Sequence, residues 1–174
     1  MRKLWVLMAV VLLAGVGAGG AALARGGGND DFEASLNGYQ EVPSKSTVAR
    51  GSFDADLDDG VIKYRLSYRN LETPALFAHI HFGQRHTNGG VIAFLCGGGG
   101  KPDCPESTGT VRGEITPADI VGPGPNAADP AADQGIEPGS FREAVRALRA
   151  GAVYANVHSE RFPGGEIRGQ VRED

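Results

Sequence analysis

The sequence has few of the residues that would indicate a nucleic-acid-binding or cysteine-rich protein. Of its 174 residues only two are cysteines and one is tryptophan, and aromatic residues make up 7%. The chain carries 17 basic against 21 acidic side chains, a formal net charge of -4, and has no long basic run. Nucleic acid is bound through clustered positive charge, so this composition argues against a nucleic-acid partner.

Other compositional classes are excluded as well. The 27 glycines follow no three-residue period, which excludes a collagen-like rod, and a hydrophobic content of 41% excludes a wholly disordered chain. The length suits one domain with appendages. The chain has no Gly-x-Ser-x-Gly elbow, and no glycine loop that would cradle phosphate precedes a helix, so hydrolytic catalysis has little support.

The N-terminus has the three parts of a secretory signal. Arg2 and Lys3 precede a long apolar run, and small residues end that run at residue 24. We expect residues 1–24 to be a signal peptide cleaved before Arg25, followed by a flexible lead-in at 25–31. A retained membrane anchor is the alternative, but glycines interrupt the apolar run. Removing two bases and no acids would leave 15 basic and 21 acidic residues, net -6, in a secreted or periplasmic protein without a membrane segment.

The two cysteines, Cys96 and Cys104, flank a run of four glycines. In an oxidising compartment they would form one disulfide that closes this short loop. A redox pair or a pair of metal-binding thiolates is the alternative, but the spacing is not Cys-x-x-Cys.

From residue 32 onward, apolar and polar residues alternate in short runs separated by turn signals such as Asn-Gly and Asp-Gly. This pattern predicts an all-β fold, an antiparallel Greek-key-like sandwich or barrel of about eight strands with one short helix, forming a single domain over residues 32–173. The expected strands are 32–36, 48–57, 62–68, 75–82, 91–95, 108–115, 152–158 and 166–171.

One helix is expected between Ser140 and Gly151. Ser140 and Glu143 have the spacing of a capping box, and apolar residues recur at helical intervals. We expect this helix to lie on the sheet as a lid. The segment 119–139 is dominated by proline, glycine, alanine and aspartate, with almost nothing apolar to bury, and is predicted to be a mobile loop.

An aspartate-rich run, residues 54–60, invites a calcium interpretation. It departs from the helix-loop-helix calcium pattern, because Asp59 stands at the glycine position and Arg65 at the final glutamate position. A hairpin turn at Asp59-Gly60 explains the run better.

The most suggestive chemistry lies in the histidines. His79 and His81 alternate with Ala78 and Ile80 on one expected strand, and His158 alternates with apolar residues on another. Residues two apart on a strand point to the same side, so the histidines would occupy sheet faces opposite the apolar ones. We expect them to converge on the outward side of neighbouring strands.

Other polar residues could join this cluster. If the last two strands form a hairpin, Glu166 would lie near His158, with Asn156 and Arg168 on the same face. His86, in the loop after the first histidine pair, would be a fourth metal ligand. Imidazoles suit copper or zinc, and the sequence does not distinguish these metals. The alternative is a structural cluster of hydrogen-bonded side chains.

Eight motifs follow one another along the chain: Leu36-Asn-Gly38, Glu41-Val-Pro43, Gly51, Ala78-His-Ile-His81, Asn88-Gly89, Gly113, Tyr154-Ala-Asn-Val-His158 and Pro163-Gly-Gly-Glu-Ile-Arg-Gly-Gln170. In this order they resemble the CHRD domain, named from chordin, an extracellular antagonist of bone morphogenetic proteins. The resemblance spans about 32–171 and implies an extracellular, mainly β domain; such domains also occur as stand-alone exported bacterial proteins. It does not imply growth-factor binding, because chordin's tandem copies and cysteine-rich modules are absent.

A fainter likeness is to copper/zinc superoxide dismutases, through a His-x-His strand followed by a glycine-rich segment with a cysteine. It implies His79, His81, His86 and His158 as copper ligands and Arg168 as a guide for an anionic substrate. Four histidines are too few for that family's two-metal site, so at most a copper-only centre is implied.

The sequence therefore favours a secreted, non-enzymatic binding module with an unknown extracellular or periplasmic ligand. Its expected binding face carries His79, His81, Asn156, His158, Glu166 and Arg168. A mononuclear copper or zinc protein, with or without dismutase-like activity, is the first alternative. A purely structural surface or matrix component is the second.

Overall fold

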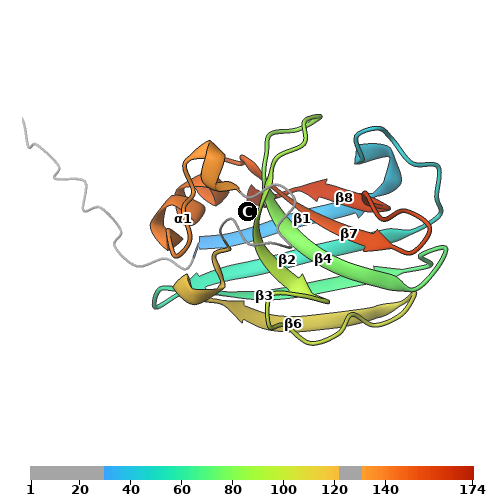
Figure 1. Cartoon of the computed structure of the whole chain (residues 1–174), viewed down its shortest axis with the longest axis horizontal. Helices are drawn as coiled ribbons and strands as arrows, with labels where there is room; N and C mark the ends of the chain where they lie inside the picture. The colour runs from blue at the N-terminus through green and yellow to red at the C-terminus, as the bar shows by residue number, and fades with distance from the viewer. Residues whose placement is uncertain (1–29, 122–130) are drawn as a thin grey trace, which may run out of the picture.

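Antiparallel strands form most of the protein in the computed structural model, which describes residues 30–121 and 131–174 (Figure 1). The expected signal peptide at 1–24, and residues 25–29 of the expected lead-in, lie outside the described residues. Asp30 and Asp31, assigned to the lead-in from sequence, are the first residues of strand β1.

The described residues form nine strands and one α-helix. The strands are β1 Asp30–Asn37, β2 Arg50–Asp58, β3 Val61–Arg69, β4 Ala75–Phe82, β5 Gly90–Cys96, β6 Gly109–Ile115, β7 Val153–Ser159, β8 Ile167–Gln170 and β9 Arg172–Glu173. The helix is α1 Phe141–Arg149, and three short 3-10 helices are η1 Gly38–Gln40, η2 Pro117–Asp119 and η3 Ala131–Gln134.

The strands form one sheet in the order β5-β4-β7-β8-β1-β2-β3-β6, and β9 pairs with β1. Every pairing in the sheet is antiparallel. The sheet curves into a nearly closed barrel, and the Tyr64 hydroxyl on β3 donates to the Leu95 carbonyl on β5, 2.7 Å away. The predicted all-β antiparallel architecture with a single helix is confirmed.

Alternation along the strands explains why the barrel closes around a core. On β3, Ile62 and Leu66 are almost fully buried while Lys63 and Arg65 are exposed, so one side of each strand faces inward. The turn from β2 to β3 has positive φ at Asp59 (47°) and at Gly60 (80°), as a two-residue hairpin requires. The hairpin predicted from the aspartate-rich run is confirmed.

Helix α1 lies at one end of the barrel, beside the start of β1, instead of on a sheet face as expected (Figure 1). Val145 and Leu148 bury its apolar side in the core. The predicted capping box is not formed, because the Ser140 side chain makes no capping hydrogen bond and Glu143 pairs with Arg146 instead.

The segment expected to be a polar mobile loop, 119–139, has more buried apolar surface than its composition indicated. Residues 122–130 lie outside the described residues, but Ile120, Ala131 and Ile136 are buried in the core. Gln134 of η3 also accepts a hydrogen bond from the Gly90 amide at the start of β5. The described part of this segment therefore packs against the barrel. A few buried apolar residues hold it there, although most of its residues are small or polar.

The predicted disulfide between Cys96 and Cys104 is present and joins the end of β5 to the segment that precedes β6. No cysteine is free. Since β5 and β6 are the two edge strands of the sheet, this bond lies where the barrel is not closed by a strand ladder.

Candidate metal centre

Strands β4 and β7 bring three histidines onto one face of the sheet. In their ladder His79 lies opposite Asn156, and His158 lies opposite Phe77. His81 follows His79 by two residues, so all three imidazoles project from the same side. The period-two pattern predicted that histidines from distant parts of the chain would converge, and in the structure they do.

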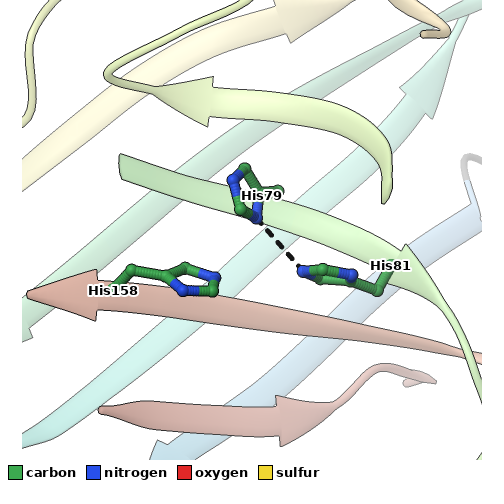
Figure 2. A group of neighbouring side chains, drawn as sticks. All are labelled: His79, His81 and His158. Atoms are coloured by element: carbon green, nitrogen blue, oxygen red, sulfur yellow. Dashed lines mark hydrogen bonds between the residues drawn. The ribbon is translucent and has the colours of Figure 1, made fainter. Parts of the chain in front are cut away.

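The three rings lie within reach of one ion (Figure 2). One nitrogen from each of His79, His81 and His158 can be chosen so that all three atoms lie within 4.8 Å of one another. Ring centroids are 4.7 Å apart for His79 and His158 and 5.1 Å apart for His79 and His81. Small movements of the rings would bring the three nitrogens to one metal ion.

Backbone carbonyls fix which nitrogen two of the histidines present. Nδ1 of His81 lies 2.9 Å from the Gly89 carbonyl, and Nδ1 of His158 lies 2.9 Å from the Pro163 carbonyl. A carbonyl oxygen only accepts hydrogen bonds, so each Nδ1 carries the proton. The Nε2 atoms of both rings therefore carry no proton and each has a lone pair, which is the arrangement in which histidine ligates metals.

These histidines lie on the expected face of β4 and β7, opposite core residues such as Ile80 and Val157, but that face is not exposed to solvent. His79, His81 and His158 are only 5%, 8% and 6% exposed. Phe77 stacks on His79 at 4.9 Å, and Phe94 meets the same ring edge-on at 4.7 Å. Aromatic side chains thus enclose the centre, and strand alternation alone does not predict such tertiary cover.

Burial also sets the charge of the cluster. Desolvation, together with the neighbouring His158 and His81, lowers the pKa of His79 from its ordinary value of 6.5 to about 2. Burial lowers the pKa of His81 and of His158 to about 4, although their backbone hydrogen bonds oppose the shift. At neutral pH all three rings are uncharged, so no proton competes with a metal ion for their lone pairs.

One atom of the cluster lacks a partner. Nε2 of His158 is buried and has no hydrogen-bond partner among the described residues. A buried polar atom without a partner costs free energy, so such atoms are rare in folded proteins. A metal ion bound at Nε2 would satisfy this lone pair.

Arg168 contacts residues that position His81. Its guanidinium lies 3.9 Å from the centre of the Tyr154 ring, and that ring stacks on His81 with a centroid distance of 4.7 Å. Arg168 also donates to the carbonyl of Thr87 (2.7 Å) and to Oδ1 of Asn88 (3.2 Å). It therefore holds the β4–β5 loop that supplies the Gly89 carbonyl to His81.

Asn156 is buried on the same face, and its amide donates to a carboxylate that the sequence analysis missed. Nδ2 of Asn156 lies 2.6 Å from Oε1 of Glu41, which is only 5% exposed. Burial raises the pKa of Glu41 to about 7, and Arg168 and Asn156 partly oppose this shift. The only sequence signal for Glu41 is its place in the Glu-Val-Pro motif.

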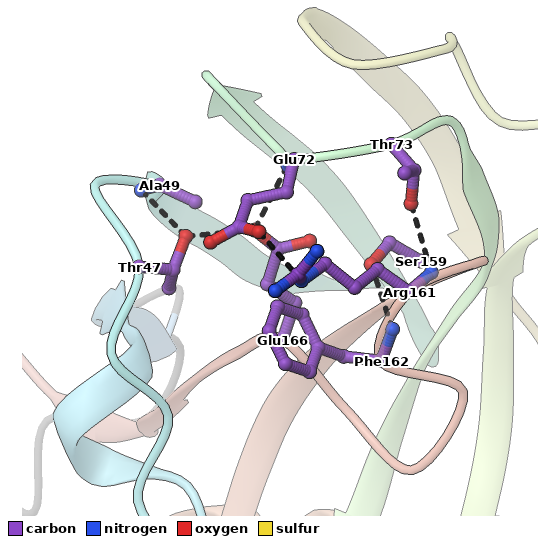
Figure 3. A network of polar contacts seen from close by, with 8 residues as sticks. All are labelled: Thr47, Ala49, Glu72, Thr73, Ser159, Arg161, Phe162 and Glu166. Atoms are coloured by element: carbon purple, nitrogen blue, oxygen red, sulfur yellow. Dashed lines mark hydrogen bonds and ion pairs between the residues drawn. The ribbon is translucent and has the colours of Figure 1, made fainter.

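Glu166 is not part of the histidine group. Its Oε1 accepts hydrogen bonds from Thr47 Oγ1 (2.8 Å) and from the Glu72 amide (3.1 Å) (Figure 3). The Glu72 carboxylate in turn pairs with Arg161 at 2.7 Å. The partner expected for His158 is thus replaced by the Pro163 carbonyl, and Glu166 ties the β7–β8 hairpin to the ends of β2 and β3.

His86, expected as a fourth ligand, is exposed in the β4–β5 loop and lies outside the group of three. Its backbone has a φ of 65°, which is typical of a turn. The described residues offer a three-histidine centre instead of the four-histidine set of the dismutase likeness.

Comparison with known families agrees with these motifs. The family model described as CHRD domain matches residues 32–171. The chain belongs to the CHRD family. No curated protein and no solved structure matches the chain. Among its described residues, this CHRD protein has no helix both long and apolar enough to cross a membrane.

Proposed function

We propose that this CHRD protein is an exported module that binds one metal ion through His79, His81 and His158, and that the ion is copper in its cuprous state. The observation that carries the proposal is the buried Nε2 of His158, which has a free lone pair and no partner among the described residues. Metal binding at this atom would replace a buried nitrogen without a partner, which costs free energy, by a coordinate bond that stabilises the folded protein.

The charge of the site favours a monovalent ion. The group of three contains no carboxylate, so its donors are neutral. The positive charge of Arg168 already contributes to lowering the pKa of His81. The cost of burying an ion rises steeply with its charge, and here no anionic ligand offsets it. Cu(I) therefore suits this environment better than Zn(II), although imidazole nitrogen binds both metals.

The enclosure of the site favours binding over catalysis. Catalytic metal centres keep a coordination position open to water or substrate. Here Phe77, Phe94 and Tyr154 pack around the three rings. The same enclosure argues against a macromolecular ligand that contacts the histidines directly. Export is supported by the signal-like N-terminus and by the disulfide, which forms in oxidising compartments.

The test is an anaerobic competition titration of residues 25–174 with Cu(I) and Zn(II) against a colorimetric chelator for each metal. We expect one Cu(I) per chain, retained in the presence of equimolar Zn(II). Failure to bind either metal would contradict the proposed function. Stoichiometric Zn(II) that Cu(I) does not displace would contradict the cuprous assignment.

Superoxide decay measured on the same copper-loaded sample tests the dismutase alternative. We expect the decay to be no faster than with the metal-free protein. Acceleration that depends on the three histidines would overturn the assignment to binding alone.

A further inference from the structure

A second feature, on strands that carry none of the histidines, is an arginine-rich surface on the outside of the barrel. Because Phe53 and Leu66 point into the core, the alternate residues of β2 and β3 point outward. Four exposed arginines share this outer face, from β2, β3 and β6. They are Arg50, Arg65, Arg69 and Arg112, here called the arginine face.

These arginines face one another in pairs. Arg50 lies directly opposite Arg69 in the β2–β3 ladder, and Arg65 lies directly opposite Arg112 in the β3–β6 ladder. Like charges in directly opposed positions destabilise a sheet. The fold thus carries two unfavourable pairings on one face, although the whole chain is acidic with a net charge of -4.

Acidic residues, among them Asp54 and Asp56, lie on the same outer face near Arg65, but they do not pair with the four arginines. Among the described residues, none of the four arginines has an acidic partner within ion-pair distance. Asp54 lies opposite Arg65 in the ladder but forms no ion pair with it. Arg50 donates only to backbone carbonyls, those of Thr47 and Ala49.

Hydroxyl groups lie between the two pairs of arginines. Ser52, Ser67 and Thr110 form a row across β2, β3 and β6, and the hydroxyls of Ser67 and Thr110 are 2.9 Å apart. Together with Arg50, Arg65 and Arg69 these residues line an open hollow of about 390 Å³. The hollow therefore offers guanidinium donors at both ends and hydroxyl groups in the middle.

We propose that the arginine face binds an acidic polysaccharide, a chain of sugars bearing carboxylate or sulfate groups. Guanidinium groups bind such oxyanions through paired hydrogen bonds, and hydroxyls suit the uncharged parts of sugars. Arg65 and Arg69 are four residues apart on β3, so the two pairs are separated by about 13 Å along the strand. An extended polymer with repeated anionic groups can reach both pairs at once.

Nucleic acid fits this face less well. Proteins that bind single strands stack bases on exposed aromatic rings. The outward positions of β2, β3 and β6 carry no aromatic residue. The three strands of this surface also carry no helix that could enter a duplex groove.

Binding to immobilised dextran sulfate and to alginate tests the proposal, using residues 25–174 at low and at physiological salt. Dextran sulfate carries only sulfates and alginate only carboxylates, so the two arms distinguish the anionic group. We expect binding to at least one polymer, weakening as salt rises. The variant R65S/R69S should bind at least tenfold more weakly.

The matched control is R85S/R142S, which removes the same charge from two exposed arginines in the β4–β5 loop and on helix α1 and should bind within about twofold of the wild type. The single variant R112S should give a smaller loss in the same direction, which covers the case in which the double variant is unstable. Absence of binding to both polymers would overturn the proposal, as would equal loss in the control. Tighter binding to duplex DNA or to phosphatidylserine vesicles at the same salt would also overturn it. Metal binding does not enter this test, so the two proposals fail separately.

Discussion

The Nδ1 atom of His79 lies 3.1 Å from Nε2 of His81, and the Gly89 carbonyl decides which of the two donates. Because Nδ1 of His81 gives its proton to Gly89, Nε2 of the neutral His81 ring accepts, and Nδ1 of His79 carries the shared proton. In the metal-free protein this hydrogen bond occupies the lone pair that a metal would use. Metal binding at Nε2 of His81 would therefore require this hydrogen bond to break.

The metal-free protein should lose stability as the pH falls from about 7 toward 4. Each buried histidine has a folded pKa below its unfolded value of 6.5, so the unfolded chain takes up more protons across this interval. The stabilising contribution is fully present above pH 6.5 and declines through the folded values. Urea denaturation of metal-free protein at several pH values measures this loss, and a flat profile between pH 7 and 4 would refute neutral, buried imidazoles.

Glu41 should act in the opposite direction. Its folded pKa, raised to about 7 from 4.5, means that its contribution is complete below pH 4.5 and is lost as the pH rises through 7. E41Q, whose amide oxygen can still accept from Asn156, should remove this loss. We expect the variant to gain about 2–3 kcal/mol of unfolding free energy on going from pH 5 to 8, relative to the wild type. If the unfolding free energies of E41Q and the wild type differed by the same amount at pH 5 and at pH 8, Glu41 would not have the raised pKa.

Much of the fold was predictable because it follows local rules. Alternation placed all eight main strands, and the Asp59-Gly60 hairpin follows from residues that accept positive φ. The shared face of His79 and His81 follows from the same alternation. The burial of that face was not predictable, because its cover comes from Phe94 on another strand.

The partners of two buried carboxylates were also missed. Glu41 and Asn156 are 115 residues apart in the chain, and no local pattern pairs them. Glu166 was expected beside His158, but β8 begins only at Ile167, and Gly165 adopts a φ of 119° just before it. The alternation rule therefore does not extend to Glu166.

Arg168 should act as a positioning residue for the metal centre. R168K keeps the positive charge but loses the two bonds to the β4–β5 loop and the flat stacking on Tyr154. Loss of such outer support weakens metal sites by about 10–100-fold, and we expect a weakening in this range for Cu(I). The competition titration measures it, with R142K on the helix surface as the control. Unchanged affinity in R168K would remove Arg168 from this role.

The disulfide should stabilise the fold without affecting the metal centre. The variant C96S/C104S opens a loop whose cysteines are eight residues apart, which should cost about 2–3 kcal/mol of unfolding free energy. Denaturation in urea measures the loss, and Cu(I) stoichiometry should stay at one per chain. Loss of copper binding from a still folded variant would show that the two sites are coupled.

Copper content after anaerobic loading and gel filtration tests the central claim most directly, comparing the wild type with H158N and H86N. Asparagine at position 158 can still donate to the Pro163 carbonyl but lacks the unpartnered nitrogen, whereas His86 is exposed and outside the group. We predict one Cu(I) per chain in the wild type and H86N, and a large loss in H158N. Equal copper in H158N and the wild type, or none in any of the three, would contradict the account.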